Sequence, residues 1–169
     1  MSLQIVNDNI CNMRTDAIVN AANSSLKMGG GVCGAIFSSA GADKLQKECD
    51  SIGGCKTGDA VITSGYNLYA KYIIHTAGPI WHGGGSGEEE LLRSCYKNSL
   101  NLAMKNNCKS VAFPLISSGI YGYPKEEALR IAITAINEFL LKANIDVYLV
   151  LFNESEYKLA QRLLDEIGK

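Results

Sequence analysis

Residues 20–34 read Asn20-Ala-Ala-Asn23-Ser-Ser-Leu-Lys-Met-Gly29-Gly-Gly31-Val-Cys33-Gly34, and an apolar run over residues 17–20 leads into them. The pattern predicts a strand that opens into three glycines and then a helix. Glycines let backbone N–H groups turn toward a ligand, and a helix N-terminus adds a partial positive charge. The amides of Asn20 and Asn23 can donate and accept hydrogen bonds, which suits hydroxyl groups. The stretch therefore predicts a site for a phosphorylated ligand with a polar sugar.

The composition is that of one globular domain spanning residues 1–169. Hydrophobic residues make up 47% of the chain and charged residues 20%, and the length suits a single buried core. The net charge of −1 provides no basic field, so a nucleic-acid partner is not expected. No apolar run approaches the roughly 20 residues that span a bilayer, and the N-terminus has no signal-peptide pattern. We expect a monomeric cytoplasmic protein that does not contact a membrane.

Most of the six cysteines, at positions 11, 33, 49, 55, 95 and 108, are expected in the core, and none is expected at a metal. None belongs to a Cys-x-x-Cys pair, and His75 and His82 are the only two histidines. Structural zinc sites need closely spaced ligands, whereas small reduced thiols commonly fill cores. We therefore expect no metal and no cofactor.

Strand-like and helix-like segments alternate along the chain. Strands are expected over 3–6, 16–22, 58–63, 71–76, 110–114 and 146–152, and helices over 32–40, 43–50, 86–106, 124–143 and 153–167. Ser86 and Glu89 form a Ser-x-x-Glu capping box for the third helix, and the acidic run Glu88-Glu89-Glu90 is expected to be solvated. Such alternation predicts a three-layer α/β domain with a mixed, largely parallel central sheet.

A second glycine-punctuated loop, Ser117-Ser-Gly-Ile-Tyr-Gly122, follows the strand expected over 110–114. Ligands of parallel sheets bind at the carboxyl ends of the strands, so the two glycine loops would face one another across a cleft. The second loop contains no lysine or arginine, so a phosphate there would be held by backbone N–H groups and hydroxyls. Residues 23–28 separate the first glycines from their strand, which excludes a standard Rossmann site, and no Gly-Lys-Ser/Thr of a P-loop follows.

Five segments of the chain, in order, resemble the macro domain family. They are residues 17–23, the glycine run, Thr57-Gly-Asp-Ala60, Ile73-Ile-His-Thr-Ala-Gly-Pro79 and Phe113-Pro-Leu-Ile-Ser-Ser-Gly-Ile-Tyr-Gly122. The similarity extends from about residue 3 to residue 167 and is greatest for the branch with ADP-ribosyl and O-acetyl-ADP-ribose hydrolases. The resemblance implies a three-layer α/β/α macro domain whose partner is ADP-ribose or an ADP-ribosylated protein.

The resemblance also implies roles for individual residues. Asn23 would hydrogen-bond the distal ribose, and backbone groups around it and the adjoining phosphate would come from Gly30, Gly31, Val32 and Cys33. The diphosphate would be covered by Ser117, Ser118, Gly119, Ile120 and Tyr121. Phe152 would pack on adenine beside Asn153, and stacking of this kind contributes roughly 1–3 kcal/mol per base. The candidates for the catalytic part of the site are Asn23, Gly31 and Cys33.

The chain departs from the family pattern at the adenine contact. Asn9-Ile10-Cys11 stands where the family commonly has Asp-Ile-Thr, whose aspartate recognises the adenine amino group. The Asn9 carbonyl could still accept from an amine, although without charge assistance. Alternatively, Asp8 would make this contact if the turn shifts by one residue.

A second departure lies in the glycine run, where Cys33 replaces an aspartate that helps position or activate water in hydrolytic relatives. Phe37 likewise replaces a frequent histidine. General-base assistance is worth roughly 10²- to 10⁴-fold in rate, so its loss could separate an enzyme from a binder. A thiol near a helix N-terminus can act as a nucleophile, for which His75 is a candidate base. A small residue that fills the loop is the simpler interpretation of Cys33.

Three functions stay open on the sequence. The first is hydrolysis of an ester at the distal ribose of mono-ADP-ribosylated protein or O-acetyl-ADP-ribose, with water activated by a substrate phosphate. The second is a reader module that binds ADP-ribose and performs no chemistry, which Cys33 favours. The third is a phosphatase that acts on ADP-ribose phosphate.

Overall fold

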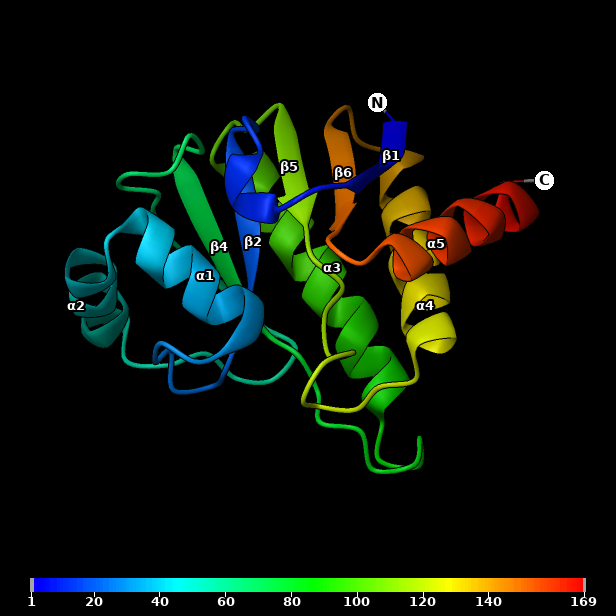
Figure 1. The fold of residues 1–169 in the computed structure, drawn as a ribbon, viewed down its shortest axis with the longest axis horizontal. Helices are drawn as coiled ribbons and strands as arrows, with labels where there is room; N and C mark the ends of the chain where they lie inside the picture. Colours follow the sequence, from blue (N-terminus) through cyan, green and yellow to red (C-terminus); the bar gives the residue numbers. More distant parts are fainter. Residues whose placement is uncertain (1, 169) are drawn as a thin grey trace.

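Six strands form one mixed sheet in the computed structural model, which describes residues 2–168 (Figure 1). The strands are β1 (Ser2–Asn7), β2 (Ala17–Ala22), β3 (Ala60–Ser64), β4 (Tyr72–Ala77), β5 (Ser110–Phe113) and β6 (Asp146–Leu151). Their order is β1-β6-β5-β2-β4-β3, and every neighbouring pair is parallel except β3 with β4. The prediction of a mixed, largely parallel sheet is confirmed.

Helices cover both faces of the sheet (Figure 1). α1 (Gly31–Ala40) and α2 (Ala42–Ile52) lie on one face, and α3 (Glu88–Lys105) and α4 (Lys125–Leu140) lie on the other. α5 (Glu154–Ile167) packs against α4 and β1, and a single 3-10 turn (Ile10–Asn12) follows β1. β2 shows why the core has two parts: Val19 joins the core under α3 and α4, whereas Ile18 joins the core under α1, because successive strand residues face opposite ways.

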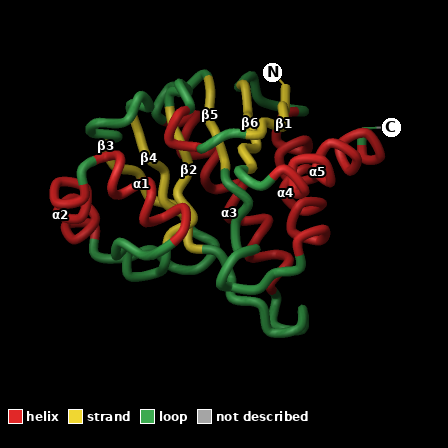
Figure 2. Tube along the Cα trace, in the orientation of Figure 1, coloured by secondary structure: helices red, strands yellow, loops and turns green. Residues whose placement is uncertain are grey.

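The position of the loops follows from the parallel pairing. β1, β2, β4, β5 and β6 all run in one direction, so the loops that follow them meet at one edge of the sheet (Figure 2). The cysteines are free thiols, five of them buried and Cys11 partly exposed, as predicted. Within residues 2–168, no group of three or more His, Cys, Asp or Glu side chains is arranged to hold a metal ion. No helix in that range is both long and apolar enough to cross a membrane.

The start of α3 differs from the prediction. Its N-cap is Gly87, which makes no side-chain capping bond, so the predicted capping box of Ser86 and Glu89 is wrong. Glu88, the first residue of the helix, turns back into the preceding loop instead. Its carboxylate accepts backbone N–H bonds from His82, Gly84 and Ser86, at 2.9, 2.9 and 2.6 Å.

Glu88 is also only 1% exposed, so the prediction that it is solvated is wrong, whereas Glu89 and Glu90 are exposed as expected. A carboxylate can accept several N–H groups at once, and each of these hydrogen bonds is strengthened by its charge. The neutral hydroxyl of the predicted Ser86 cap would bind the same N–H groups more weakly. The N–H bonds, that of His82 foremost, lower the pKa of Glu88 to about 2. The side chain therefore stays charged and ties the loop before α3 together.

A buried polar chain crosses the sheet at His75 of β4. The amide nitrogen of Asn20, on β2, lies 3.1 Å from His75 Nδ1, and Thr63 Oγ1, on β3, lies 3.0 Å from Nε2. Asn20 Nδ2 can only donate, so the bonds fit an imidazole protonated at Nε2. His75 is fully buried, and burial lowers its pKa to about 4. The imidazole is therefore neutral at neutral pH.

His75 should make stability depend on pH between its unfolded pKa of 6.5 and its folded pKa of about 4. The unfolded imidazole takes up a proton in this window and the folded one does not, so stability is lost as the pH falls. For His75→Gln we expect the drop in the free energy of unfolding between about pH 7.5 and 4.5 to be smaller by about 2–3 kcal/mol. Urea unfolding at the two pH values measures the difference.

His82→Gln is the matched control, because the His82 side chain is exposed. It should retain the pH dependence of the wild type. If His75→Gln has the same pH dependence as the wild type, His75 is not the group that makes stability depend on pH in this window.

Candidate functional site

Three loops at the carboxyl edge of the sheet enclose a cavity of about 360 Å³. They follow β5, β2 and β4, three adjacent strands of the sheet. The lining consists mainly of glycines and small or apolar residues, with no charged side chain among the described residues that form it. These residues are Ala21, Ala22, Asn23, Gly29, Gly30, Gly31, Val32, Cys33, Gly78, Leu115, Ile116, Ser117, Gly119, Ile120 and Tyr121.

Two larger hollows, of about 810 and 830 Å³, lie along α3. One is bounded by α3, β3 and the end of α2, and the other by α3 and α4. Neither is lined by a residue whose buried polar atom lacks a partner, whereas the smaller cavity is lined by Ser117. The smaller cavity also lies where parallel sheets bind ligands, so it is the candidate site.

The glycine run forms one wall of the cavity. α1 begins at Gly31, whose φ is +56°, in the left-handed region that favours glycine. A Cβ at Gly34 would lie 2.5 Å from the carbonyl oxygen of Gly29, so this close approach also requires glycine. The first N–H groups of α1 have no acceptor within the helix, and the residues that carry them line the cavity. Uncharged N–H groups at a helix N-terminus favour an anion, so anion binding at this wall stays a prediction.

Ser117 forms the opposite wall. Its side chain is 6% exposed, and its hydroxyl has no hydrogen-bond partner within residues 2–168. Its φ of +69° is uncommon for a residue other than glycine. A Cβ at Gly78, in the loop after β4, would collide with Ser117 Oγ. The glycine at this position therefore leaves room for the Ser117 side chain. A strained residue with an unsatisfied buried hydroxyl is typical of a ligand contact.

Trp81 braces the loop that carries Ser117. The Trp81 backbone N–H donates to the Tyr121 carbonyl at 2.8 Å, and the Trp81 ring packs on Tyr123 with 4.6 Å between centroids. Gly84 approaches the six-membered ring of the Trp81 indole, where a Cβ at Gly84 would lie 3.0 Å from the nearest ring carbon. Since Glu88 fixes the segment around Gly84, the loop after β4 and the loop after β5 brace one another.

Cys33 lines the cavity, but its contacts are not those of an activated nucleophile. Asn20 Nδ2 donates to Cys33 Sγ at 3.6 Å, and the thiol donates to the Lys27 carbonyl at 3.8 Å. The candidate base His75 is bonded to Asn20, so Asn20 stands between base and thiol. Asn20 itself is fully buried and does not line the cavity. The arrangement agrees with the simpler interpretation of Cys33 as a small wall residue.

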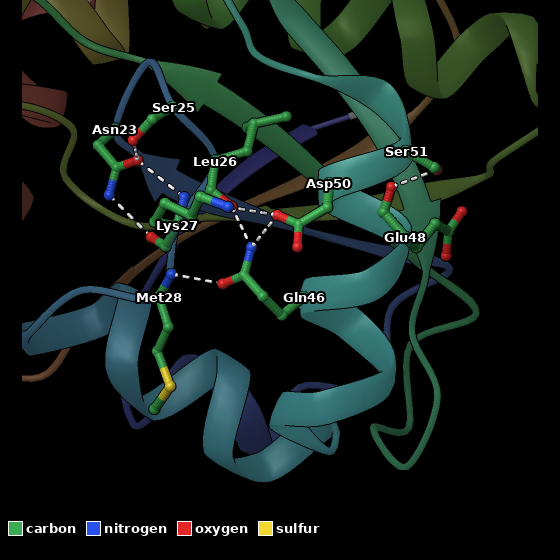
Figure 3. A network of polar contacts seen from close by, with 9 residues as sticks. All are labelled: Asn23, Ser25, Leu26, Lys27, Met28, Gln46, Glu48, Asp50 and Ser51. Carbon is green, nitrogen blue, oxygen red and sulfur yellow. Dashed lines mark hydrogen bonds and ion pairs between the residues drawn. The ribbon is translucent and has the colours of Figure 1, made fainter.

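Asn23 lines the cavity. Its amide also makes hydrogen bonds within its own loop (Figure 3). Its Nδ2 donates to the Lys27 carbonyl at 2.8 Å, and its Oδ1 accepts from the Lys27 N–H and the Ser25 hydroxyl, both at 2.9 Å. The side chain therefore shapes its own loop as well as the cavity wall. Sequence reasoning assigned only the second of these roles.

The residues expected around adenine form a separate group at the ends of β1 and β6. The Asp8 N–H donates to the Leu151 carbonyl at 3.2 Å, which brings the chain after β1 beside Phe152. Phe152 is 81% exposed. Ile10 is buried nearby, at the start of the 3-10 turn.

The polar residues of this group also cap helices. Asn9 Oδ1 accepts from the Cys11 N–H at 2.9 Å and caps the 3-10 turn. Asn153 Oδ1 accepts from the Ser155 and Glu156 N–H groups and caps α5. Asp8 Oδ1 accepts from the Asn12 amide at 3.1 Å. Which of Asp8 and Asn9 would contact adenine stays a prediction.

The cavity thus brings together nine of the predicted residues, namely Asn23, Gly30, Gly31, Val32, Cys33, Ser117, Gly119, Ile120 and Tyr121. It does not include Asn20, Ser118 or the group at β1 and β6. Sequence reasoning missed Gly78, although a glycine between the end of a strand and Pro79 is a turn signal that could have indicated it.

Comparisons with known proteins agree with this geometry. The model of the family described as "Macro domain" matches residues 19–132. A macro domain-containing protein of Methanosarcina mazei is 52% identical over 167 residues, 98% of this chain and 89% of its own length. An O-acetyl-ADP-ribose deacetylase of Citrobacter rodentium is 45% identical over 172 residues, 98% of this chain and 97% of its own.

Solved structures extend the similarity to the fold. A macrodomain of Oceanobacillus iheyensis solved with ADP has a TM-score of 0.95 and 42% identity, covering 98% of this chain and 91% of that one. A Trypanosoma brucei macrodomain in complex with ADP-ribose has a TM-score of 0.87 and 38% identity, covering 95% and 68%. From the sequence segments, the sheet with its loops and these matches, the chain belongs to the macro domain family.

Proposed function

We propose that this protein binds ADP-ribose and hydrolyses an ester at its distal ribose, from O-acetyl-ADP-ribose or a mono-ADP-ribosylated protein. The observation that carries the proposal is the pairing of an uncharged glycine wall at the start of α1 with the unpartnered hydroxyl of Ser117 across one cavity. Such a pair suits a diphosphate held by N–H groups and hydroxyls. The similarity to macrodomains solved with ADP or ADP-ribose supports the same ligand.

The spacing of the two residue groups supports a long ligand. Phe152 follows β6, and the cavity lies at the ends of β5, β2 and β4. From β6 to β4 the sheet advances three strand spacings, about 14 Å at roughly 4.8 Å each. In the proposed pose adenine stacks on the exposed Phe152 ring, with Asp8 or Asn9 beside it, and the distal ribose lies at Asn23.

The reaction requires little of the protein beyond positioning. Water adds to the acyl carbon of the ester, the bond from that carbon to the ribose oxygen breaks, and a carboxylic acid and a free ribose hydroxyl are released. Asn23 and the glycine wall would orient the ribose, and correct orientation alone can supply several kcal/mol of the barrier. A phosphate of the substrate would accept the proton of the attacking water. The similarity to proteins named O-acetyl-ADP-ribose deacetylase supports this chemistry.

The second candidate is a reader module that binds ADP-ribose without chemistry. Cys33 favours it, because this residue stands where the family resemblance expects an aspartate. The contacts of its thiol go to Asn20 and Lys27, neither of which supplies a base. Both candidates share the ligand and differ only in turnover.

Wild-type protein is expected to bind ADP-ribose in calorimetric titration and to release acetate from O-acetyl-ADP-ribose faster than buffer. If the protein binds ADP-ribose but turns over neither this ester nor a glutamate-linked ADP-ribosylated protein, the hydrolase is excluded and the reader module is the function supported. No heat and no thermal shift with millimolar ADP-ribose would contradict both.

Ser117→Ala should weaken ADP-ribose binding by about 10- to 100-fold, because a hydrogen bond to a charged phosphate contributes about 1.5–3 kcal/mol. Stability should not fall, since the hydroxyl has no partner to lose in the free protein. Ser99→Ala is the matched control, because the Ser99 hydroxyl is also buried and unpartnered but lies in α3, outside the cavity lining. Calorimetry and thermal unfolding measure both variants, and equal affinities would remove Ser117 from the site.

Cys33→Asp should raise kcat for O-acetyl-ADP-ribose, because it would restore a carboxylate at the cavity wall. General-base assistance is worth about 10²- to 10⁴-fold, and an acidic residue in the first turn of α1 is favourable there. Cys33→Asn has a similar shape without the charge and should lack the gain. A Cys33→Asp enzyme no faster than the wild type would mean that a base is not what limits the natural protein.

A further inference from the structure

The loop between β2 and the glycine run is clamped from α2 by one side chain, Gln46 (Figure 3). Gln46 Oε1 accepts from the Met28 N–H at 2.9 Å, and Gln46 Nε2 donates to the Leu26 carbonyl at 3.0 Å. Nε2 also donates to Asp50 Oδ1 at 2.9 Å. The carboxylate can only accept, so it fixes which end of the Gln46 amide is the donor.

These bonds meet those of Asn23 on the same two peptide units. In the unit joining Leu26 to Lys27, the carbonyl bonds to Gln46 and the N–H bonds to Asn23. In the unit joining Lys27 to Met28, the carbonyl bonds to Asn23 and the N–H bonds to Gln46. Neither peptide unit can rotate without breaking a bond to each side chain. Asn23 and Gln46 therefore hold one another in place through the loop.

The loop needs such a clamp. Leu26 has a φ of +57°, in the left-handed region that residues with a Cβ rarely adopt, and its side chain is fully buried. The Lys27 ammonium adds a 2.6 Å ion pair to Asp50, but both side chains are about half exposed. Such exposed pairs hold geometry weakly, so the fixed orientation depends on the amide of Gln46.

We propose that Gln46 is a positioning residue that fixes the orientation of the Asn23 amide toward the distal ribose. This inference rests on the proposed function, which assigns the ribose to Asn23. Gln46 does not line the cavity and acts only through the peptide units of residues 26–28. Its loss should therefore affect ligands that carry a distal ribose and leave ligands without one unaffected.

The test compares Gln46→Ala with Glu48→Ala, using ADP-ribose and ADP as probes. Glu48 is a matched control on the same helix. Its carboxylate accepts from the Ser64 N–H at 3.1 Å and the Tyr66 hydroxyl at 2.7 Å, so it braces β3 and not the ribose loop. ADP lacks the distal ribose and reports on the remainder of the site.

In calorimetry, Gln46→Ala is expected to bind ADP-ribose about tenfold more weakly and ADP within about twofold of the wild type. Glu48→Ala should bind both ligands as the wild type does. A merely structural role would weaken both ligands alike in Gln46→Ala. That result, or unchanged binding of both, would overturn the proposal.

Hydrogen exchange of the Lys27 and Met28 amides tests the clamp without any ligand. Both amides should exchange faster in Gln46→Ala and at the wild-type rate in Glu48→Ala. Unchanged exchange in Gln46→Ala would overturn the clamp, whatever the ligand measurements show. Failure of the wild type to bind ADP-ribose would instead contradict the proposed function, so the two failures are distinguishable.

Discussion

The structure depends on the parallel pairing of β2 with β4 on one side and β5 on the other. Parallel strands send their following loops to the same edge, so this pairing alone brings the glycine run, Gly78 and Ser117 around one cavity. β2 is buried on both faces, and a one-residue slip would exchange its two sets of core side chains. The hydrophobic core therefore fixes where the three loops meet, and contacts within the loops shape the cavity wall.

In the proposed function, the site binds an anion without presenting a charged side chain to it. Its donors are backbone N–H groups and one hydroxyl, and their direction depends on backbone conformations at Gly31 and Ser117 that residues with a Cβ seldom adopt. Glu88 ties the loop after β4, and the Trp81 backbone N–H bonds to the Tyr121 carbonyl in the loop after β5. Gln46 and Asn23 hold the peptide units of residues 26–28. Preorganised dipoles of this kind need little rearrangement when a ligand binds.

The order of elements, the two-faced burial of β2, the facing glycine loops and the cap at Asn153 were predictable, because each follows from local pattern or from the rules of parallel sheets. Glu88 and Gln46 were not. A Ser-x-x-Glu pattern resembles a capping box wherever it occurs, and only the folded loop shows that three N–H groups converge on Glu88. Gln46 gave no signal, because its partners at Leu26 and Met28 are main-chain atoms whose identity no side-chain pattern encodes.

Cys33 sits at the end of a chain of neutral groups, and this neutrality bears on the chemistry. The contacts run from Thr63 on β3 through His75 and Asn20 to the Cys33 thiol. Burial lowers the pKa of His75 to about 4, so the imidazole is uncharged at neutral pH. A proton taken up anywhere along this chain would place an unpaired charge in the core, at a cost of several kcal/mol. The chain therefore suits a role in holding the cavity wall and not in moving a proton. In the proposed hydrolysis, proton transfer would then fall to the substrate itself, whose phosphate would lie against the glycine wall.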